Sequence, residues 1–140
     1  MGKRFMLKEL SDSGDKRGGM CVVEGGRDLP FTVRRFFYDF HTTGTEARGN
    51  HANRRSRFAF ISLAGSCAVT VDDGEYRERF LLDDPHKLLY TDRMTWKVMD
   101  TFSPDNVLLI VSDSHYDSDE YIRDYGEFMK QLKEMNGGQP

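Results

Sequence analysis

The stretch FAFISLAGSCAVTVDDG, residues 58–74, decides the fold class. It holds two short runs of apolar, aromatic and β-branched residues, separated by Ala64-Gly65 and closed by Asp72-Asp73-Gly74. Runs of this length between turn residues are typical of β-strands, and glycine supplies the positive φ that a tight turn needs. The stretch therefore predicts consecutive antiparallel strands.

The same alternation continues outward from Phe5 to Val111, and helical periodicity is absent there. Strands are predicted at Met20–Glu24, Phe31–Phe40, Arg57–Leu63, Cys67–Asp72, Glu75–Leu82, Lys87–Thr91, Thr95–Thr101 and Val107–Ser112. Many short strands between turn signals predict an all-β sandwich or barrel, and this number suits a jelly roll.

The pattern changes after Asp117. Ser118 or Asp119 is a candidate cap for a helix whose apolar residues fall at helical spacing. These residues are Tyr121, Ile122, Tyr125, Phe128, Met129 and Leu132. The pattern predicts a C-terminal helix that lies against the barrel, followed by a frayed tail at Asn136–Pro140.

Length and composition exclude several classes of protein. With 140 residues the chain has room for one domain, residues 1–140, and no composition break divides it. Lys and Arg (20) nearly balance Asp and Glu (23), which is not the basic excess of a nucleic-acid binder. No apolar run approaches the roughly 20 residues of a membrane helix.

The N-terminus and the cysteines bear on the cellular compartment. Lys8 and Glu9 interrupt the first ten residues before an apolar signal-peptide core could form, so we expect a cytoplasmic protein. Cys21 and Cys67 both lie in apolar runs, and we expect two reduced thiols in the core rather than a disulfide framework.

The densest polar cluster is residues 48–57, RGNHANRRSR, directly before the decisive stretch. It has two readings: a solvated basic hairpin loop, or the start of a strand that points into the mouth of the barrel. In the second reading His51 moves protons near neutral pH, while the arginines bind a phosphate or pyrophosphate. These arginines are Arg48, Arg54, Arg55 and Arg57.

A metal site does not follow from this cluster. Small barrels of this kind often bind a divalent ion through His-x-His, a following Glu and a distant His. Here Asn53, Arg57 and Lys97 occupy the places of the three later ligands. One imidazole cannot hold a metal alone, so the sequence predicts none.

Three aromatic residues have both a structural and a functional reading. Tyr38 is a packing residue or a phenol that relays a proton beside His51. Tyr90 and Trp96 are core residues or rings in the barrel mouth that stack on a base.

The sequence also resembles a known family through a series of short phrases. In order they are Asp15-x-Arg17-Gly18, residues 29–35 (LPFTVRR), Arg48-Gly49-x-His51-Ala52, Gly65-Ser66-Cys67, Asp72-Asp73-Gly74, Trp96, Phe102-Ser103, Tyr116-Asp117 and residues 121–125 (YIRDY). They cover nearly the whole chain and resemble the nucleotide-sugar 3,4-ketoisomerases of the cupin superfamily. The resemblance implies a cupin-type double-stranded β-helix with a C-terminal helix.

What the resemblance implies about activity is specific. Family members convert dTDP-4-keto-6-deoxy-D-glucose into a dTDP-3-keto-6-deoxyhexose without a metal or other cofactor. The product serves the synthesis of 3-amino-3,6-dideoxy sugars of bacterial surface glycans, such as lipopolysaccharide and S-layer glycans. Family members are homodimers that can exchange N-terminal strands. We expect no nucleic-acid or membrane partner.

Carried over by motif, His51 is the first histidine of the family's His-x-His pair, and Tyr38 falls in the strand that faces the sugar. Asn53 departs from the pattern, because an amide does not exchange protons near neutral pH. We expect His51 to act as the base, Tyr38 to relay the hydroxyl proton and Asn53 to hold a substrate oxygen. The remaining candidates for substrate binding are Arg17, Arg35, Arg48, Arg54, Arg57, Tyr90, Trp96 and Lys97.

Two alternatives stay open at this point. One is a sugar-nucleotide-binding cupin that has lost its activity, marked by Asn53. The other is an epimerase acting on the same type of substrate with the same histidine base.

Overall fold

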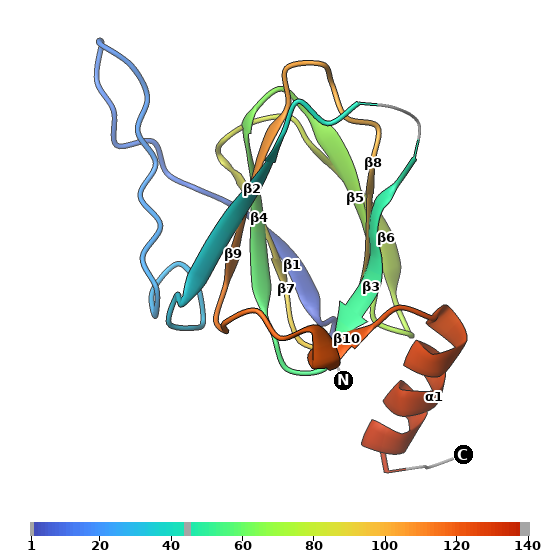
Figure 1. Cartoon of the computed structure of the whole chain (residues 1–140). Coiled ribbons are helices and arrows are strands. Elements are labelled where there is room, and N and C mark those ends of the chain that lie inside the picture. The colour runs from blue at the N-terminus through green and yellow to red at the C-terminus, as the bar shows by residue number, and fades with distance from the viewer. Residues whose placement is uncertain (1, 44–45, 138–140) are drawn as a thin grey trace.

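The computed structural model describes residues 2–43 and 46–137, which form two facing antiparallel sheets and a C-terminal helix (Figure 1). The first sheet has the order β1-β7-β4-β9-β2 and the second the order β10-β3-β8-β5-β6. The strands are β1 (Phe5–Glu9), β2 (Arg35–Phe40), β3 (Arg48–Asn53), β4 (Phe58–Ala64), β5 (Cys67–Asp72), β6 (Arg77–Leu82), β7 (Lys87–Thr91), β8 (Trp96–Asp100), β9 (Val107–Ser112) and β10 (Tyr121–Ile122). The predicted jelly-roll class is confirmed.

The core fills the space between the sheets. On β4 the inward side chains are Phe58 and Phe60, which pack with Val69 and Val71 of β5 in one buried cluster. Burial of such side chains stabilises the fold by about 1.5 to 3 kcal/mol each. The opposite face of β4 is covered as well, because Ala59 belongs to a second buried cluster. Burial on both faces explains why β4 reads as a continuous apolar run rather than an alternating one.

Most predicted strands are confirmed, three of them with the same limits: Cys67–Asp72, Lys87–Thr91 and Val107–Ser112. The turn glycines also behave as expected, with φ of 64° at Gly65 and 92° at Gly74. One detail is wrong: β4 and β5 are consecutive but lie in different sheets. The turn at Gly65 therefore connects the two sheets rather than closing a hairpin.

The segment between β1 and β2 is not a strand where one was predicted. Met20–Glu24 lies in an extension that projects away from the barrel (Figure 1), and strand Phe31–Phe40 is confirmed only from Arg35 onward. The apolar residues of the extension, Leu29 and Phe31 among them, pack on the outer face of β4 instead of pairing with a strand.

Side-chain contacts also attach this extension to the barrel. The His86 ring lies between two carboxylates, with Nδ1 2.5 Å from Asp84 Oδ1 and Nε2 3.0 Å from Asp12 Oδ2. The hydrogen bonds to Asp12 and Asp84 raise the pKa of His86. This histidine therefore has a structural role at the base of the extension.

The C-terminal helix begins later than predicted. Ser118–Glu120 is a 3-10 turn, η1, after which Tyr121 and Ile122 pair with Asn53 and Ala52 of β3. Helix α1 (Tyr125–Met135) follows, and the Asp124 carboxylate accepts a hydrogen bond from the N–H of Glu127 at 2.9 Å. Helix α1 ends at Met135, directly before the predicted tail Asn136–Pro140, of which residues 138–140 lie outside the described residues.

Helix α1 covers one end of the barrel. Phe128 is fully buried, and its ring lies 5.7 Å from that of Trp96, while Leu132 completes the buried stripe. Within the part of the chain that the structure describes, no helix has the length and apolar character needed to cross a membrane. Cys21 and Cys67 are free thiols, and burial raises the pKa of Cys67 to about 11.

Candidate active site

A cavity of about 140 Å³ lies between the two sheets, and His51 and Lys97 are on its wall. Its other polar lining residues are Asp39, Arg48 and Tyr121, and the rest of the lining is mainly apolar. A small cavity with apolar walls and a few converging polar groups is the usual form of a small-molecule site.

The backbone of β3 is irregular where it passes this cavity. A register shift between Gly49 and His51 leaves Asn50 at a φ of 55°. Gly49 has a φ of 85°, and a side chain there would place its Cβ 2.9 Å from both the Lys97 carbonyl oxygen and Met99 Cε. Only glycine fits this close approach, and the resulting bulge sets the direction in which His51 points.

His51 is a buried imidazole held in its neutral form. Its ring lies 4.8 Å from the ring of Tyr121, measured between centroids. Burial lowers the pKa of His51 to about 4, and the positive charges of Lys97 and Arg123 act in the same direction. The imidazole therefore carries a free lone pair at neutral pH, which a general base requires.

Lys97 faces His51 across the β3–β8 pair, where their Cα atoms are register partners. Its side chain is only 1% exposed. The ammonium donates to Asn53 Oδ1 at 3.2 Å and to the Thr95 carbonyl at 3.1 Å, and it lies 4.7 Å from the centre of the Phe58 ring. Burial lowers the pKa of Lys97 to about 7, although the charge of Glu120 opposes this.

Asn53 continues a buried chain of hydrogen bonds away from the cavity. Its amide donates to Glu120 Oε1 at 2.6 Å, and the Ser56 hydroxyl donates to Glu120 Oε2 at 2.6 Å. Asn53 and Glu120 are both buried. The Asn53 amide thus bridges Lys97 and Glu120 within the protein, and both of its ends have a protein partner, which differs from the expected contact with a substrate oxygen.

The predicted arginines separate into two groups. Arg48 lies at the rim of the cavity, 3.2 Å from Asp39, and Arg35 points to the same interior, with its guanidinium 5.9 Å from the Phe58 ring. The Nε of Arg35 is buried and has no hydrogen-bond partner among the described residues. These two side chains remain candidates for binding an anion.

The other arginines are bound to protein groups. Arg57 binds Asp113 at 2.8 Å, Arg54 donates to Gln131 at 2.9 Å, and Arg17 forms an ion pair with Asp15 at the exposed tip of the extension. Arg55, in the same basic run, pairs with Asp117 at 2.6 Å. Within one chain the structure does not bring these side chains to the cavity.

The aromatic candidates also lie away from the cavity. Tyr38 is 56% exposed on the outer face of β2, where its ring packs on Phe40 at 6.1 Å, whereas its neighbours Phe37 and Asp39 line the cavity. Tyr90 packs on Phe31 outside the barrel, and Trp96 packs beneath α1. The structure therefore supports the packing reading of Tyr90 and Trp96 and does not place Tyr38 beside His51.

Aromatic and basic residues near His51 were not predicted as site residues. The Tyr121 and Tyr116 rings lie 5.7 Å apart, and the guanidinium of Arg123 lies 4.9 Å from the centre of the Tyr121 ring. Tyr116 also lies 5.7 Å from the Arg35 guanidinium. Tyr121 and Arg123 belong to the YIRDY phrase that supports the family resemblance. The helical spacing of its apolar residues predicts a packing role for Tyr121, so the sequence alone does not mark it as a site residue.

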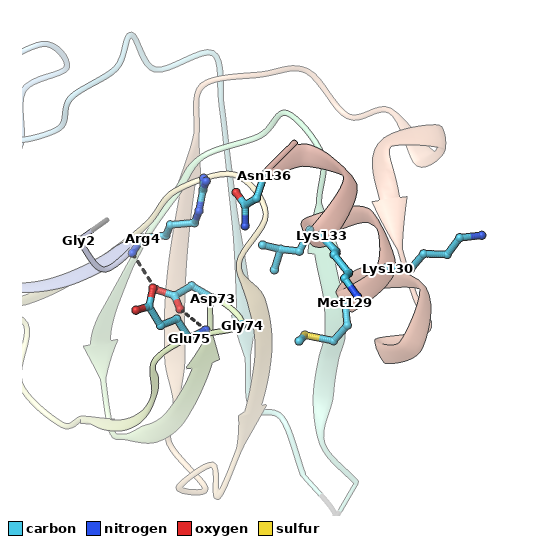
Figure 2. A pocket seen from close by; sticks show the side chains of 10 residues that line it. Gly2, Arg4, Asp73, Gly74, Glu75, Met129, Lys130, Lys133 and Asn136 are labelled. Atoms are coloured by element: carbon cyan, nitrogen blue, oxygen red, sulfur yellow. Dashed lines mark hydrogen bonds between the residues drawn. The ribbon is translucent and has the colours of Figure 1, made fainter. Parts of the chain in front are cut away.

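A wider hollow of about 590 Å³ lies elsewhere, between α1 and the β5–β6 turn (Figure 2). Met129 and Lys133 line it from the helix and Asp73 from the turn. The Asp73 carboxylate is occupied, because it accepts from the backbone N–H groups of Arg4 at 3.0 Å and Tyr76 at 2.7 Å. The described residues that line this hollow include no histidine. The hollow therefore has no counterpart to His51 beside Lys97.

The described ranges 2–43 and 46–137 contain no group of three His, Cys, Asp or Glu side chains placed to hold a metal ion. Metal independence of the reaction remains a prediction.

Comparison with known proteins assigns the family. Residues 3–133 match the family model described as FdtA, WxcM-like, C-terminal. The TDP-4-oxo-6-deoxy-alpha-D-glucose-3,4-oxoisomerase of Aneurinibacillus thermoaerophilus is 36% identical over 122 residues, which are 87% of this chain and 88% of that protein.

Two solved structures agree in fold and sequence. WlaRA, a TDP-fucose-3,4-ketoisomerase from Campylobacter jejuni, superimposes with a TM-score of 0.88 and 34% identity, covering 94% of this chain and 98% of its own. The second structure is a histidine-to-asparagine variant of the 3,4-ketoisomerase QdtA from Thermoanaerobacterium thermosaccharolyticum in complex with TDP-4-keto-6-deoxyglucose. It superimposes with a TM-score of 0.89 and 28% identity, covering 96% of this chain and 97% of its own. The chain belongs to the family described as "FdtA: WxcM-like, C-terminal" and is a sugar-nucleotide 3,4-ketoisomerase.

Proposed function

We propose that this chain moves the keto group of TDP-4-keto-6-deoxyglucose from C-4 to C-3, with His51 as the base. The observation that carries the proposal is the neutral, buried imidazole on the wall of the cavity between the two sheets. The relative from Aneurinibacillus acts on this type of sugar, and the QdtA variant binds the same compound. Use of the product for amino sugars of surface glycans, and a cytoplasmic location, remain predictions.

The cavity volume indicates which part of the substrate it holds. At about 140 Å³ it is smaller than the roughly 300 to 1,000 Å³ of sites that enclose a whole drug-sized ligand. We therefore place the sugar inside and the nucleoside diphosphate across the rim. Arg35, Arg48 and Arg123 supply positive charge for the diphosphate, and Tyr116 and Tyr121 offer ring faces for the base.

The reaction follows from the acidity of the C-3 proton, which lies next to the C-4 ketone. His51 takes this proton, the C–H electron pair forms a C-3/C-4 double bond, and the carbonyl electrons move to O-4. The protonated imidazole then returns a proton to C-4, the O-3 hydroxyl loses its proton and becomes a ketone, and O-4 gains a proton to become the new hydroxyl. The bound diphosphate and the developing negative charge oppose the positive charges of Arg123 and Lys97, which raises the pKa of His51 during this step.

A single assay separates the three candidate functions. The protein is incubated with TDP-4-keto-6-deoxyglucose, and the sugar is followed by NMR. A 3-keto product supports the ketoisomerase. Bound but unchanged substrate would show a silent binding protein, and a 4-keto sugar with inverted configuration would show an epimerase.

Chelation is expected to leave turnover unchanged. The His51 imidazole on the cavity wall carries the proton transfer proposed here, and this step needs no metal ion. The measurement is turnover after dialysis against EDTA, compared with an undialysed sample. Loss of activity that added divalent metal restores would contradict this prediction.

We further propose that two copies of the chain pair through strand β2. This strand is the edge of its sheet in the described structure, and Phe36, Tyr38 and Phe40 on its outer face are 63%, 56% and 61% exposed. An apolar edge strand is a surface that proteins usually cover by association. A second copy, related by two-fold symmetry, offers the same apolar face as a partner.

The double substitution Phe36→Asp, Phe40→Asp is expected to convert a dimer into a monomer in sedimentation at micromolar concentration. A control at the exposed Tyr76, Tyr76→Asp, should leave the dimer intact. We also propose, as the family resemblance implies, that the two copies exchange their N-terminal strands. Cysteines at Leu7 and Leu89, which are register partners on β1 and β7, test this exchange. A disulfide-linked dimer on oxidation supports exchange, and a cross-linked monomer excludes it. A monomeric unmodified protein would contradict the whole proposal.

A further inference from the structure

Lys97 is an unusual residue to find inside the barrel. Lysine is almost never fully buried unless it is paired with a negative charge. Within residues 2–43 and 46–137 its two hydrogen-bond partners are neutral oxygens, Asn53 Oδ1 and the Thr95 carbonyl. An ammonium has three donors, so one is left for a group in the cavity that Lys97 lines.

The isomerisation needs two proton transfers, and His51 accounts for only one of them. Hydrogen moves from C-3 to C-4, and a second proton must leave O-3 and arrive at O-4. Tyr38, the sequence-based candidate for this second transfer, lies on the outer face of β2. Asn53 faces the interior, but an amide does not titrate near neutral pH.

We propose that Lys97 carries the hydroxyl proton between O-3 and O-4 of the sugar and stabilises the negative charge that develops on O-4. This inference rests on the proposed ketoisomerase function and assigns a second catalytic residue to it. The supporting geometry is the register pairing of Lys97 with His51, which places both side chains on the wall of one cavity.

The two transfers balance without any added reactant. As His51 removes the C-3 proton, the Lys97 ammonium gives a proton to O-4, which leaves a neutral enediol and a neutral amine. The amine then takes the O-3 proton as the C-3 carbonyl forms, and the His51 imidazolium gives its proton to C-4. Both side chains end in their starting forms.

The surroundings of Lys97 suit this exchange. Burial lowers the pKa of Lys97 to about 7, so both of its forms are present near neutral pH. The charged and titratable groups around it are His51 on β3, Tyr121 on β10, Asp39 and Arg48 at the rim and Glu120 behind Asn53. The Phe58 ring, 4.7 Å away, adds a cation–π contact to the ammonium form.

The test compares Lys97→Arg and Lys97→Met with the unmodified protein in deuterated water. Arginine keeps the positive charge but stays protonated, so it can stabilise an enediolate without passing on a proton. We expect Lys97→Arg to isomerise at least about 10²-fold more slowly, yet to exchange the C-3 proton of the substrate with solvent. Lys97→Met should lose both reactions and keep its affinity for TDP. Lys87→Arg, at the start of β7 in the other sheet and outside the cavity lining, is the matched control and should behave like the unmodified protein.

Two results would overturn the inference: isomerisation by Lys97→Arg within about threefold of the unmodified protein, or by Lys97→Met with an unchanged pH profile. If Lys97→Arg fails to fold, Lys97→Met and the pH profile decide alone, because the unmodified protein should show an ionisation near pH 7 in its turnover. Failure of the proposed function would look different, since the unmodified protein itself would then give no 3-keto product.

Discussion

Replacement of His51 by asparagine should reduce turnover of TDP-4-keto-6-deoxyglucose by at least about 10²-fold, the lower end of what a positioned general base contributes. Asparagine has a similar size and can still hydrogen bond, but it cannot take a proton near neutral pH. The affinity for TDP should change little, because the basic groups proposed for the diphosphate are Arg35, Arg48 and Arg123. Catalysis and binding would therefore separate.

The measurements are turnover by NMR and TDP affinity by calorimetry. The matched control is His41→Asn, because His41 is exposed and has a φ of 49°, which asparagine tolerates well. Turnover of His51→Asn close to that of the unmodified protein would place the base elsewhere.

The second large effect is expected for Glu120→Ala. This carboxylate is buried and accepts hydrogen bonds from the Asn53 amide, the Ser56 hydroxyl and the Ser56 backbone N–H. Its removal leaves the Asn53 amide and the Ser56 backbone N–H without this acceptor, while the Ser56 hydroxyl keeps its contact with Ser114. It also takes away the negative charge that raises the pKa of Lys97. We expect the free energy of unfolding to fall by about 2 to 6 kcal/mol, because each of two buried donors left unsatisfied costs about 1 to 3 kcal/mol.

Chemical denaturation of the two proteins measures this difference directly. Glu134→Ala on the exposed face of α1 is the control, with an expected change within about 0.5 kcal/mol. Glu120→Ala should also lower the pKa of Lys97 further, because the charge of Glu120 now raises it. A stability loss no larger than that of the control would show that the buried network does not hold the barrel together.

The sequence predicted best those strands that are short apolar runs with turn residues on both sides. Cys67–Asp72 and Val107–Ser112 are bounded by turn residues and match the structure residue for residue. Strand β3, Arg48–Asn53, was not among the predicted strands, because its inward positions carry His51 and Asn53 instead of apolar residues. A polar strand interior looks like a loop in sequence, although here it marks the cavity.

The sequence singles out a cavity residue where the chemistry of that residue is distinctive. His51 was identified as the one histidine in a polar cluster, and the structure places it on the cavity wall. Tyr38 could not be placed in the same way, because residues alternate between the two faces of a strand and a shift of one position reverses the face. Phe37 and Asp39 face the cavity, and Tyr38 faces outward.

The arginines show that the sequence does not predict which groups a charged side chain binds in the folded chain. Arg54, Arg55 and Arg57 are adjacent to His51 in the chain, but each binds a group from a segment more than fifty residues away. Nothing in the sequence indicates that Gln131, Asp117 and Asp113 are the partners of these particular arginines. Arg123 is the reverse case. It is far from His51 in the sequence, and the pairing of β10 with β3 brings it close to His51 in the folded chain.

One measurement tests the central claim most directly, namely that His51 moves a proton between C-3 and C-4 inside the barrel. TDP-4-keto-6-deoxyglucose is incubated in deuterated water with the unmodified protein and with His51→Asn, and both samples are followed by NMR. The account predicts that the unmodified protein yields a 3-keto sugar with deuterium at C-4, whereas His51→Asn binds TDP but neither isomerises the sugar nor exchanges its C-3 proton. Deuterium at C-5 of a sugar that keeps its 4-keto group, or equal C-3 exchange by both proteins, would contradict it.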